Sequence, residues 1–284
     1  MSSENLRLFM YGQFVEAEDC NYYSGIVYPK CVPFSVFNAM STFTVRDDDV
    51  WLLSYPKAGA AWMMEIAHHI AEYESHATDV VLFPEFAISE HEPNYEVICE
   101  TQSPRFIASH LQGSLLPPQL GESNAKIIYI ARNPKDVAVS LYNHYQVDTA
   151  IPNVKSWDVF FDAFIRNAVV FGSWADHTLY WWQRREKSNV LFITYEEFKQ
   201  NRKNVMNQIR EFLGKEIETS ILDDIDKKSV SKRVLNKEQM KEASRFPKQG
   251  NIGMWKRVFT KKQNELFDRE YAAWIGNSGL KLKF

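Results

Sequence analysis

The chain has 284 residues, 45% of them hydrophobic and 14% aromatic, so it is long enough to bury one large core or two modest ones. Its net charge is -3, with 33 Lys and Arg residues interspersed among 36 Asp and Glu residues, which leaves no basic stripe on which nucleic acid could dock. The first twenty residues lack the apolar core of a signal peptide, and no uncharged apolar run is long enough to span a membrane. We therefore expect a cytoplasmic protein without a nucleic-acid or membrane partner.

Few residues are arranged for disulfide or metal chemistry. Cys20, Cys31 and Cys99 are widely spaced and include no C-x-x-C pair, which indicates free thiols in a reducing compartment. The seven histidines form no H-E-x-x-H or Cys/His pattern. The sequence therefore predicts no metal site.

A repeated pattern along the chain predicts the fold class. Short β-branched or aromatic runs at 50–55, 126–131 and 189–195 are each followed by a turn or polar break and then by helical spacing. The helix after the third run is expected to end at Gly214, because glycine commonly follows the last helical turn. Alternating strands and helices indicate a parallel sheet with helices on both faces.

The domain organisation is expected to be simple. No internal repeat, low-complexity tract or Gly/Ser linker divides the sequence. We predict a single α/β domain over residues 1–284, with a central, mostly parallel sheet flanked by helices. Residues 1–42 are expected to form an irregular segment that packs on this domain.

The first strand-to-helix junction has the composition of an anion site. The strand ends at Tyr55, and the next helix begins near Ala60, so backbone N–H groups face the carboxyl edge of the sheet. Between them, Lys57 supplies positive charge and Gly59 permits close approach of the backbone. An ordinary turn with a solvent-exposed lysine is the alternative. The loop of nucleotide triphosphatases does not fit, because no G-K-[ST] element is present.

The second junction repeats this arrangement. Arg132 follows the strand at 126–131, and Ser140 lies about two turns into the next helix. An arginine can grip a phosphate with two hydrogen bonds, and a serine hydroxyl can complete the site. Two such sites suit a ligand with two separated phosphates, although a surface arginine and a helix-interior serine are the plainer interpretation of each residue alone.

A third short strand is predicted at 105–110, with His110 at its carboxyl end. Ligands of open α/β sheets bind at this edge. A lone histidine is often purely structural, but a histidine between two anion sites is a reasonable general base.

Together these motifs resemble those of the cytosolic sulfotransferases, which transfer a sulfonate group from 3′-phosphoadenosine 5′-phosphosulfate (PAPS) to a hydroxyl or amine. The family pattern T-Y-P-K-S-G-T-T-W corresponds to SYPKAGAAW here, K-T-H-L-P to ASHLQ, and A-R-N-x-K-D-x-x-V-S-x-Y to ARNPKDVAVSLY. Later matches are FGSWADHTLYWW, ITYEEF and KQGNIGMWK, so the resemblance runs from about Phe43 to the C-terminus.

The resemblance implies the P-loop-like sulfotransferase fold, PAPS as co-substrate, adenosine 3′,5′-bisphosphate (PAP) as product, and no metal. The first junction would hold the 5′ end, the second the 3′-phosphate, and the loop near Gly250 would close on that phosphate. The cofactor-binding residues that the resemblance implies are Lys57, Ala58, Gly59, Ala60, Ala61, Trp62, Arg132, Ser140, Tyr195, Ser229, Lys248, Gln249 and Gly250.

The same resemblance implies the catalytic roles. His110 would take the proton of the acceptor, and Lys57 would neutralise the leaving phosphate oxygen. The acceptor-binding residues implied are Phe83, Phe86, His110 and His144. His144 stands where the family often has Phe, and with Glu85 it makes this side of the site more polar. We therefore expect a small-molecule acceptor, a phenol or a phenolic monoamine.

The chain also departs from the family pattern at the reaction centre. Three alanines, Ala58, Ala60 and Ala61, replace hydroxyl residues, and Ala108 replaces a lysine. The alternative function is therefore a sulfotransferase-like nucleotide- or ligand-binding protein with weakened or no catalysis. In the dimer motif of the family, Lys261 replaces an apolar residue, which predicts a monomer or a weak homodimer.

Overall fold

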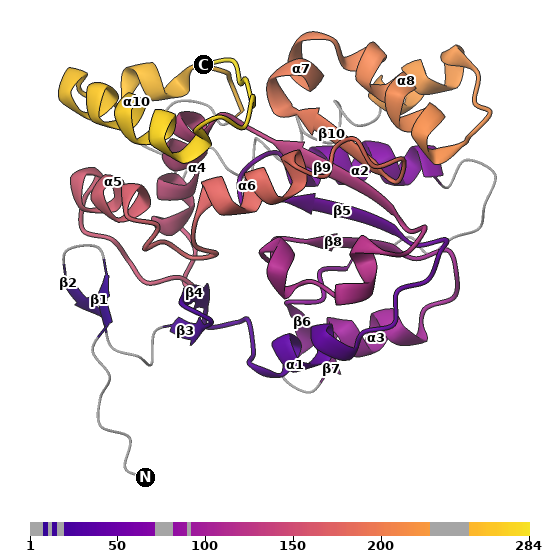
Figure 1. Cartoon of the computed structure of the whole chain (residues 1–284), viewed down its shortest axis with the longest axis horizontal. Coiled ribbons are helices and arrows are strands. Elements are labelled where there is room, and N and C mark those ends of the chain that lie inside the picture. Colours follow the sequence, from indigo (N-terminus) through magenta and orange to yellow (C-terminus); the bar gives the residue numbers. More distant parts are fainter. Residues whose placement is uncertain (1–7, 11–12, 16–19, 72–81, 90–91, 228–249) are drawn as a thin grey trace.

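A computed structural model describes residues 8–10, 13–15, 20–71, 82–89, 92–227 and 250–284. Figure 1 shows the strands of the main sheet side by side in the middle of the molecule, with helices around them. The strands are β1 (Leu8–Met10), β2 (Gln13–Val15), β3 (Cys20–Tyr23), β4 (Ile26–Pro29), β5 (Val50–Ser54), β6 (Ala87–Ser89), β7 (Glu92–Pro93), β8 (Phe106–Ser109), β9 (Lys126–Ala131) and β10 (Val190–Thr194). The α-helices that matter for the site and its supporting core are α1 (Ser35–Thr42), α2 (Ala60–Ala71), α3 (Asn94–Glu100), α4 (Pro134–Tyr145), α5 (Trp157–Ile165), α6 (Trp174–Trp182), α7 (Tyr195–Gln200), α8 (Arg202–Leu213) and α10 (Lys261–Ile275).

The main sheet is parallel and has the strand order β10-β9-β5-β8. The predicted α/β class is therefore confirmed, and each strand of this sheet begins and ends within one residue of its predicted range. The predicted helix end is also found, because Gly214 caps α8 in the left-handed conformation at φ 68°. All three cysteines are free thiols.

Alternate residues of each strand enter two different cores, as the two-residue period of a strand requires. In β5, Trp51 and Leu53 belong to the larger core, whereas Val50 and Leu52 belong to the smaller core on the other face. The larger core is covered by α1, α4, α5, α6 and α10, and the smaller core by α2 and α8. Because both faces are buried, the strands read as continuous apolar runs in the sequence.

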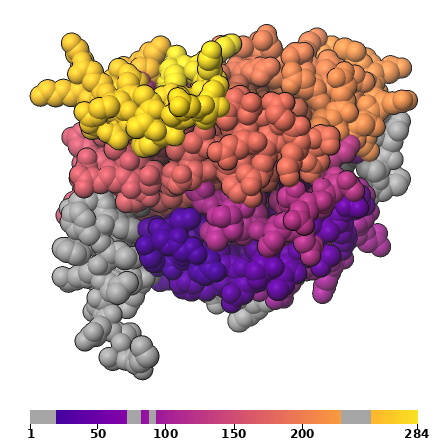
Figure 2. Space-filling model, in the orientation of Figure 1, coloured from indigo at the N-terminus to yellow at the C-terminus, as the bar shows by residue number. Residues whose placement is uncertain are grey.

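The N-terminal segment contributes to the larger core from Cys20 onward. A hairpin of β3 and β4 precedes α1, and Tyr28, Val36 and Phe37 are buried in that core. At the other end of the chain, Phe267 of α10 is fully buried, and Figure 2 shows the yellow C-terminal residues lying against those of α5 and α6 on the face drawn.

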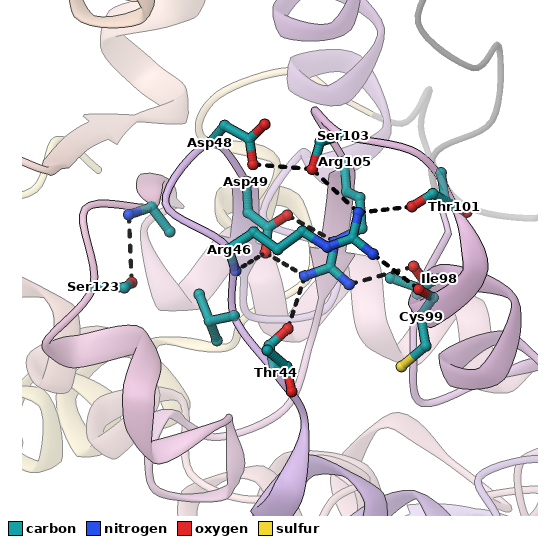
Figure 3. Close-up of polar contacts among 12 residues, drawn as sticks. Thr44, Arg46, Asp48, Asp49, Ile98, Cys99, Thr101, Ser103, Arg105 and Ser123 are labelled. Carbon is teal, nitrogen blue, oxygen red and sulfur yellow. Dashed lines mark hydrogen bonds and ion pairs between the residues drawn. The ribbon is translucent and has the colours of Figure 1, made fainter.

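A buried ion pair joins β5 and β8 at the edge of the sheet opposite to the junctions discussed above (Figure 3). Arg105 Nε and Nη2 donate to the two carboxylate oxygens of Asp49 at 2.7 and 2.6 Å, and both side chains are at most 2% exposed. Arg46 donates to the backbone carbonyls of Thr101 and Cys99 at 2.8 and 2.9 Å. These bonds hold the beginnings of β5 and β8 in place relative to each other. They therefore also fix the relative positions of the carboxyl ends of the two strands.

We predict that Asp49→Ala lowers the free energy of unfolding by about 3 kcal/mol or more, because it leaves the Arg105 charge buried without its partner. Urea denaturation measures this change. The control is Asp162→Ala, which breaks the exposed pair with Arg166 and should change stability by less than about 1 kcal/mol. Equal effects of the two substitutions would contradict this prediction.

Candidate active site

The four strands of the main sheet place a functional candidate at each carboxyl end. Lys57 follows β5, His110 follows β8, Arg132 follows β9, and Tyr195 follows β10. Because the strands are parallel, these ends lie at one edge of the sheet. The sheet therefore brings together residues that are far apart in the sequence.

The edge between β5 and β9 is a topological switch point. The helix after β5, α2, packs into the smaller core, whereas the helix after β9, α4, packs into the larger core on the opposite face. Ligands of open α/β sheets bind where neighbouring strands send their helices to opposite faces. Lys57 and Arg132 lie on the two sides of this point, and Arg132 Nη1 donates to the Lys57 carbonyl at 3.2 Å.

The first junction has a strained, tightly packed backbone. Lys57 has φ +67° and Gly59 has φ +109°, both in the region that L side chains rarely adopt. A Cβ atom at Gly59 would lie 2.5 Å from Cδ2 of Tyr195, so only glycine fits. At the start of α2, the N–H groups of Trp62 and Met63 donate to the Gly59 carbonyl at 3.2 and 3.3 Å, which leaves those of Ala60 and Ala61 without an acceptor within the helix. Ala58 is fully buried and donates its N–H to the Tyr55 carbonyl at 3.1 Å.

Arg132 is held in place with one donor unused. The residue is 4% exposed, and its Nη2 donates to the Asn251 carbonyl at 3.3 Å. Its guanidinium lies 4.5 Å from the centre of the Tyr195 ring, whereas Nε is buried without a hydrogen-bond partner among the described residues. Burial, and then the charge of Arg132, lower the pKa of Lys57. Two neighbouring cations with an unused donor form a site that an anion would stabilise.

Residues predicted to contact the nucleoside lie beside this pair of cations. Tyr195 Oη donates to the Gly250 carbonyl at 2.7 Å, and the Tyr195 ring lies 6.3 Å from that of Trp62. Trp62 is 2% exposed, with the guanidinium of Arg202 4.4 Å from its ring centre. Ser140 is partly exposed in α4, one turn before His144. Three further predicted residues, Ser229, Lys248 and Gln249, lie outside the described residues.

His110 is oriented for use as a base. Its Nδ1 lies 2.8 Å from the Ser54 carbonyl, which can only accept a hydrogen bond, so Nδ1 carries the proton and Nε2 keeps a lone pair. Burial lowers the pKa of His110 to about 4, since the charged form is poorly solvated. The imidazole is therefore neutral near pH 7 and able to take a proton. Ser54 was not among the predicted residues, and it had no sequence signal beyond ending a strand.

Glu85 holds the backbone of His110. Its Oε1 accepts the His110 N–H at 2.6 Å, and the residue is fully buried. Burial raises the pKa of this carboxyl to about 7. The sequence suggested Glu85 only as a polar group near the acceptor, whereas the structure shows that it fixes the segment that carries His110.

Aromatic rings surround the His110 imidazole. The Phe83 ring lies 5.0 Å and the Phe171 ring 5.8 Å from it, and the Phe83 and Phe86 rings are 5.6 Å apart. The predicted aromatic residues are thus adjacent to the predicted base. Phe171 was not predicted.

His144 adds polarity to the same region. Its Nε2 lies 3.1 Å from Oδ2 of Asp148, one turn later on the chain. Burial, and then the charge of Lys57, lower the pKa of His144, while Asp148 opposes this. A neutral imidazole and a carboxylate therefore lie near Lys57.

The described residues contain neither a cluster of metal ligands nor a membrane-spanning helix. Within those ranges, no group of three or more His, Cys, Asp or Glu side chains is placed to hold a metal ion. No helix in the described part of the chain is both long and apolar enough to cross a bilayer.

Comparison with known proteins identifies the family. Residues 47–279 match the family model of the sulfotransferase domain. The chain is 32% identical to human sulfotransferase 1C2 over 257 residues, which cover 83% of this chain and 86% of the relative. It is 34% identical to rat sulfotransferase 1A1 over 283 residues, which cover 91% and 97%.

Solved structures agree with this result. The crystal structure of mouse sulfotransferase SULT7A1 complexed with PAP superimposes with a TM-score of 0.77 at 29% identity, covering 92% of this chain and 96% of that one. Retinol dehydratase shares the fold at a TM-score of 0.78 and 16% identity, covering 92% and 90%. An α/β fold with two cations at its switch point and a neutral histidine beside them belongs to the class of α/β proteins that bind anionic ligands at this edge of the sheet. Within that class, the chain belongs to the sulfotransferase domain family, so the predicted resemblance and enzyme class are confirmed.

We predict that Glu85→Gln changes how stability depends on pH. The folded-state pKa of about 7 lies above the unperturbed value of 4.5, so this group's stabilising contribution is full below pH 4.5 and is lost as pH rises through 7. Between pH 5 and pH 8, the free energy of unfolding of the wild type should fall by about 2 to 3 kcal/mol more than that of the variant. Urea denaturation at several pH values measures this difference.

The control for this experiment is Glu96→Gln, which changes an exposed glutamate of α3. Its pH profile should follow that of the wild type. Parallel profiles for Glu85→Gln and the wild type would show that the Glu85 carboxyl does not titrate in this range.

Proposed function

We propose that this protein transfers a sulfonate group from PAPS to the hydroxyl of a small acceptor, a phenol or a phenolic monoamine. The observation that carries the proposal is the neutral imidazole of His110, whose Nδ1 is fixed by the Ser54 carbonyl while Lys57 and Arg132 lie at the neighbouring strand ends. Mouse SULT7A1, which shares the fold, is complexed with PAP, and this supports PAPS as the co-substrate.

The residues present fit such a nucleotide. The Nε of buried Arg132, which has no hydrogen-bond partner among the described residues, is a donor for the 3′-phosphate, and Ser140 lies further along α4, where it can add a hydroxyl. Lys57 and the first N–H groups of α2 suit the 5′ end. Gly59 lets the Tyr195 ring pack directly against the turn, because a Cβ atom there would lie only 2.5 Å from that ring. When bound, PAPS supplies the sulfonate group.

His110 and Lys57 then have complementary roles. Nε2 of His110 takes the proton of the acceptor hydroxyl while the acceptor oxygen forms its bond to sulfur. The bond from sulfur to the bridging phosphate oxygen breaks, and Lys57 neutralises the charge that develops on that oxygen. The low pKa of His110 keeps the base unprotonated before the reaction.

The groups around His110 support the proposed acceptor class. Phe83 and Phe86 offer aromatic faces suited to a phenol ring. His144 and Asp148 supply a hydrogen-bond acceptor and a negative charge that favour an ammonium group. We propose that the protein acts in the cytoplasm as a monomer or a weak homodimer, because Lys261 stands where the dimer motif of the family has an apolar residue.

One observation favours the alternative of a binding protein without turnover. Ala58 and Ala108 are fully buried, so neither position offers a polar side chain to the reacting group. An assay with labelled PAPS and a panel of phenols, monoamines and sterols decides between the two functions. Label on an acceptor supports transfer, whereas PAP binding without label on any acceptor supports the alternative.

We predict that His110→Ala lowers kcat by about 10²- to 10⁴-fold, because it removes the proton acceptor, without weakening PAP binding. Turnover of labelled PAPS and calorimetry with PAP measure the two quantities. The control, His69→Ala, changes a histidine in the last turn of α2, at the end remote from Lys57, and should leave both unchanged. Turnover by His110→Ala at the wild-type rate would exclude His110 as the base.

We also predict that His144→Phe lowers the preference for amines. A phenolic amine and the same phenol without its amino group are compared in each protein. Because the substitution removes the hydrogen-bond acceptor of the His144 imidazole and adds an apolar ring, the ratio of kcat/KM for amine over neutral phenol should fall by about tenfold. An unchanged ratio, or equal turnover of a catecholamine and a steroid alcohol by the wild type, would contradict the proposed acceptor class.

A further inference from the structure

Asp136 joins α4 to the segment 250–255. It is the third residue of α4 and is 1% exposed. Its Oδ2 accepts the Gly253 N–H at 2.7 Å, and its Oδ1 accepts the Trp255 N–H at 3.0 Å. Both carboxylate oxygens are thus bonded to the backbone of a segment more than one hundred residues away in the sequence.

The carboxylate of Asp136 is itself fixed by the cap of the helix. Asn133 is the N-cap residue, and its Oδ1 accepts the Asp136 N–H at 2.9 Å. Asn133 Nδ2 donates to Asp136 Oδ2 at 3.0 Å and to Glu196 Oε1 at 2.8 Å. Because these groups are buried and mutually bonded, Asp136 has little freedom to move away from the segment it holds.

The segment held by Asp136 also contacts two residues of the proposed nucleotide site. The Gly250 carbonyl accepts from Tyr195 Oη at 2.7 Å, and the Asn251 carbonyl accepts from Arg132 Nη2 at 3.3 Å. The segment turns at Gly253, which has φ +79°. Its position therefore determines one of the two carbonyl acceptors that orient the Arg132 guanidinium.

We infer that Asp136 is a positioning residue for 3′-phosphate recognition, and this inference rests on the proposed function. Direct contact with a phosphate is disfavoured, because two negative charges would repel each other and both oxygens of Asp136 already accept N–H groups. Asp136 acts through the backbone of 250–255, which holds Arg132 with its unused Nε available to the ligand.

The test compares PAP with adenosine 5′-monophosphate, which differs from it only by lacking the 3′-phosphate. Calorimetry gives the two dissociation constants for each protein. The ratio of the constant for adenosine 5′-monophosphate to the constant for PAP measures recognition of the 3′-phosphate. Asp136→Asn places an amide N–H against a backbone N–H of the segment, so the ratio should fall by about tenfold, chiefly through weaker PAP binding. A general loss of structure would instead weaken both nucleotides alike.

The matched control is Asp176→Asn, because Asp176 is also the third residue of its helix but is exposed. It should leave the ratio unchanged. A second variant, Gly253→Ala, leaves α4 intact and strains only the segment, since its φ disfavours an L side chain and the added Cβ meets only Lys256 at 3.7 Å. It should lower the ratio in the same direction, even if Asp136→Asn does not fold.

Three outcomes are distinguishable. A lowered ratio in Asp136→Asn or, where that variant does not fold, in Gly253→Ala supports the inference. An unchanged ratio in the folded variants, with wild-type protein preferring PAP, overturns the role of Asp136 and leaves the proposed function standing. Equal affinity of the wild type for both nucleotides overturns the proposed function and this inference together.

Discussion

The parallel pairing of β5 with β9 is the constraint on which the site depends. In this register Ser54 lies opposite Ile130, so the two strands end nearly level, and the turns that follow them meet. The buried pair of Arg105 and Asp49 fixes the opposite end of β5, so a shift of that end would also move the carboxyl end of the strand. Because α2 and α4 leave to opposite faces, Lys57 and Arg132 approach each other without a helix between them. The strand order and the directions of α2 and α4 therefore determine where the site lies.

Burial disfavours the charged forms of both His110 and Lys57 at this edge of the sheet. It lowers the pKa of His110 and keeps the imidazole neutral, and together with Arg132 it lowers the pKa of Lys57. Two cations held side by side are unfavourable in the free protein, and a bound polyanion relieves that repulsion. The bound polyanion would also raise the pKa of Lys57 back toward its ordinary value. A nucleotide with several negative charges would thus neutralise Lys57 and Arg132, while the base His110 stays uncharged.

Local sequence pattern predicted the main sheet because its strands are short, mostly apolar runs, rich in β-branched or aromatic residues, that end at turns. The residues just after those runs, Lys57, His110 and Arg132, could be predicted for the same reason. Glu85 and Asp136 could not be assigned their roles, because their partners lie 25 and 117 residues away and no local periodicity records the contact. Asp136 stood inside the A-R-N-P-K-D motif, so its presence was visible, but only tertiary packing shows that it holds Gly253.

The alanines that depart from the family pattern affect binding more than folding. Ala58 is fully buried and its N–H is bonded to the Tyr55 carbonyl, and Ala108 packs in the smaller core. Neither position leaves an unsatisfied polar group, so these residues carry no penalty in the free protein. These alanines lack the side-chain hydrogen-bond donors that the family residues offer to the ligand. A hydrogen bond to a charged group contributes about 1.5 to 3 kcal/mol. The backbone at Lys57–Gly59, the start of α2 and the cations remain, and these donors do not depend on the replaced side chains. The proposed chemistry therefore relies on the strained backbone turn at Lys57 and on two cations.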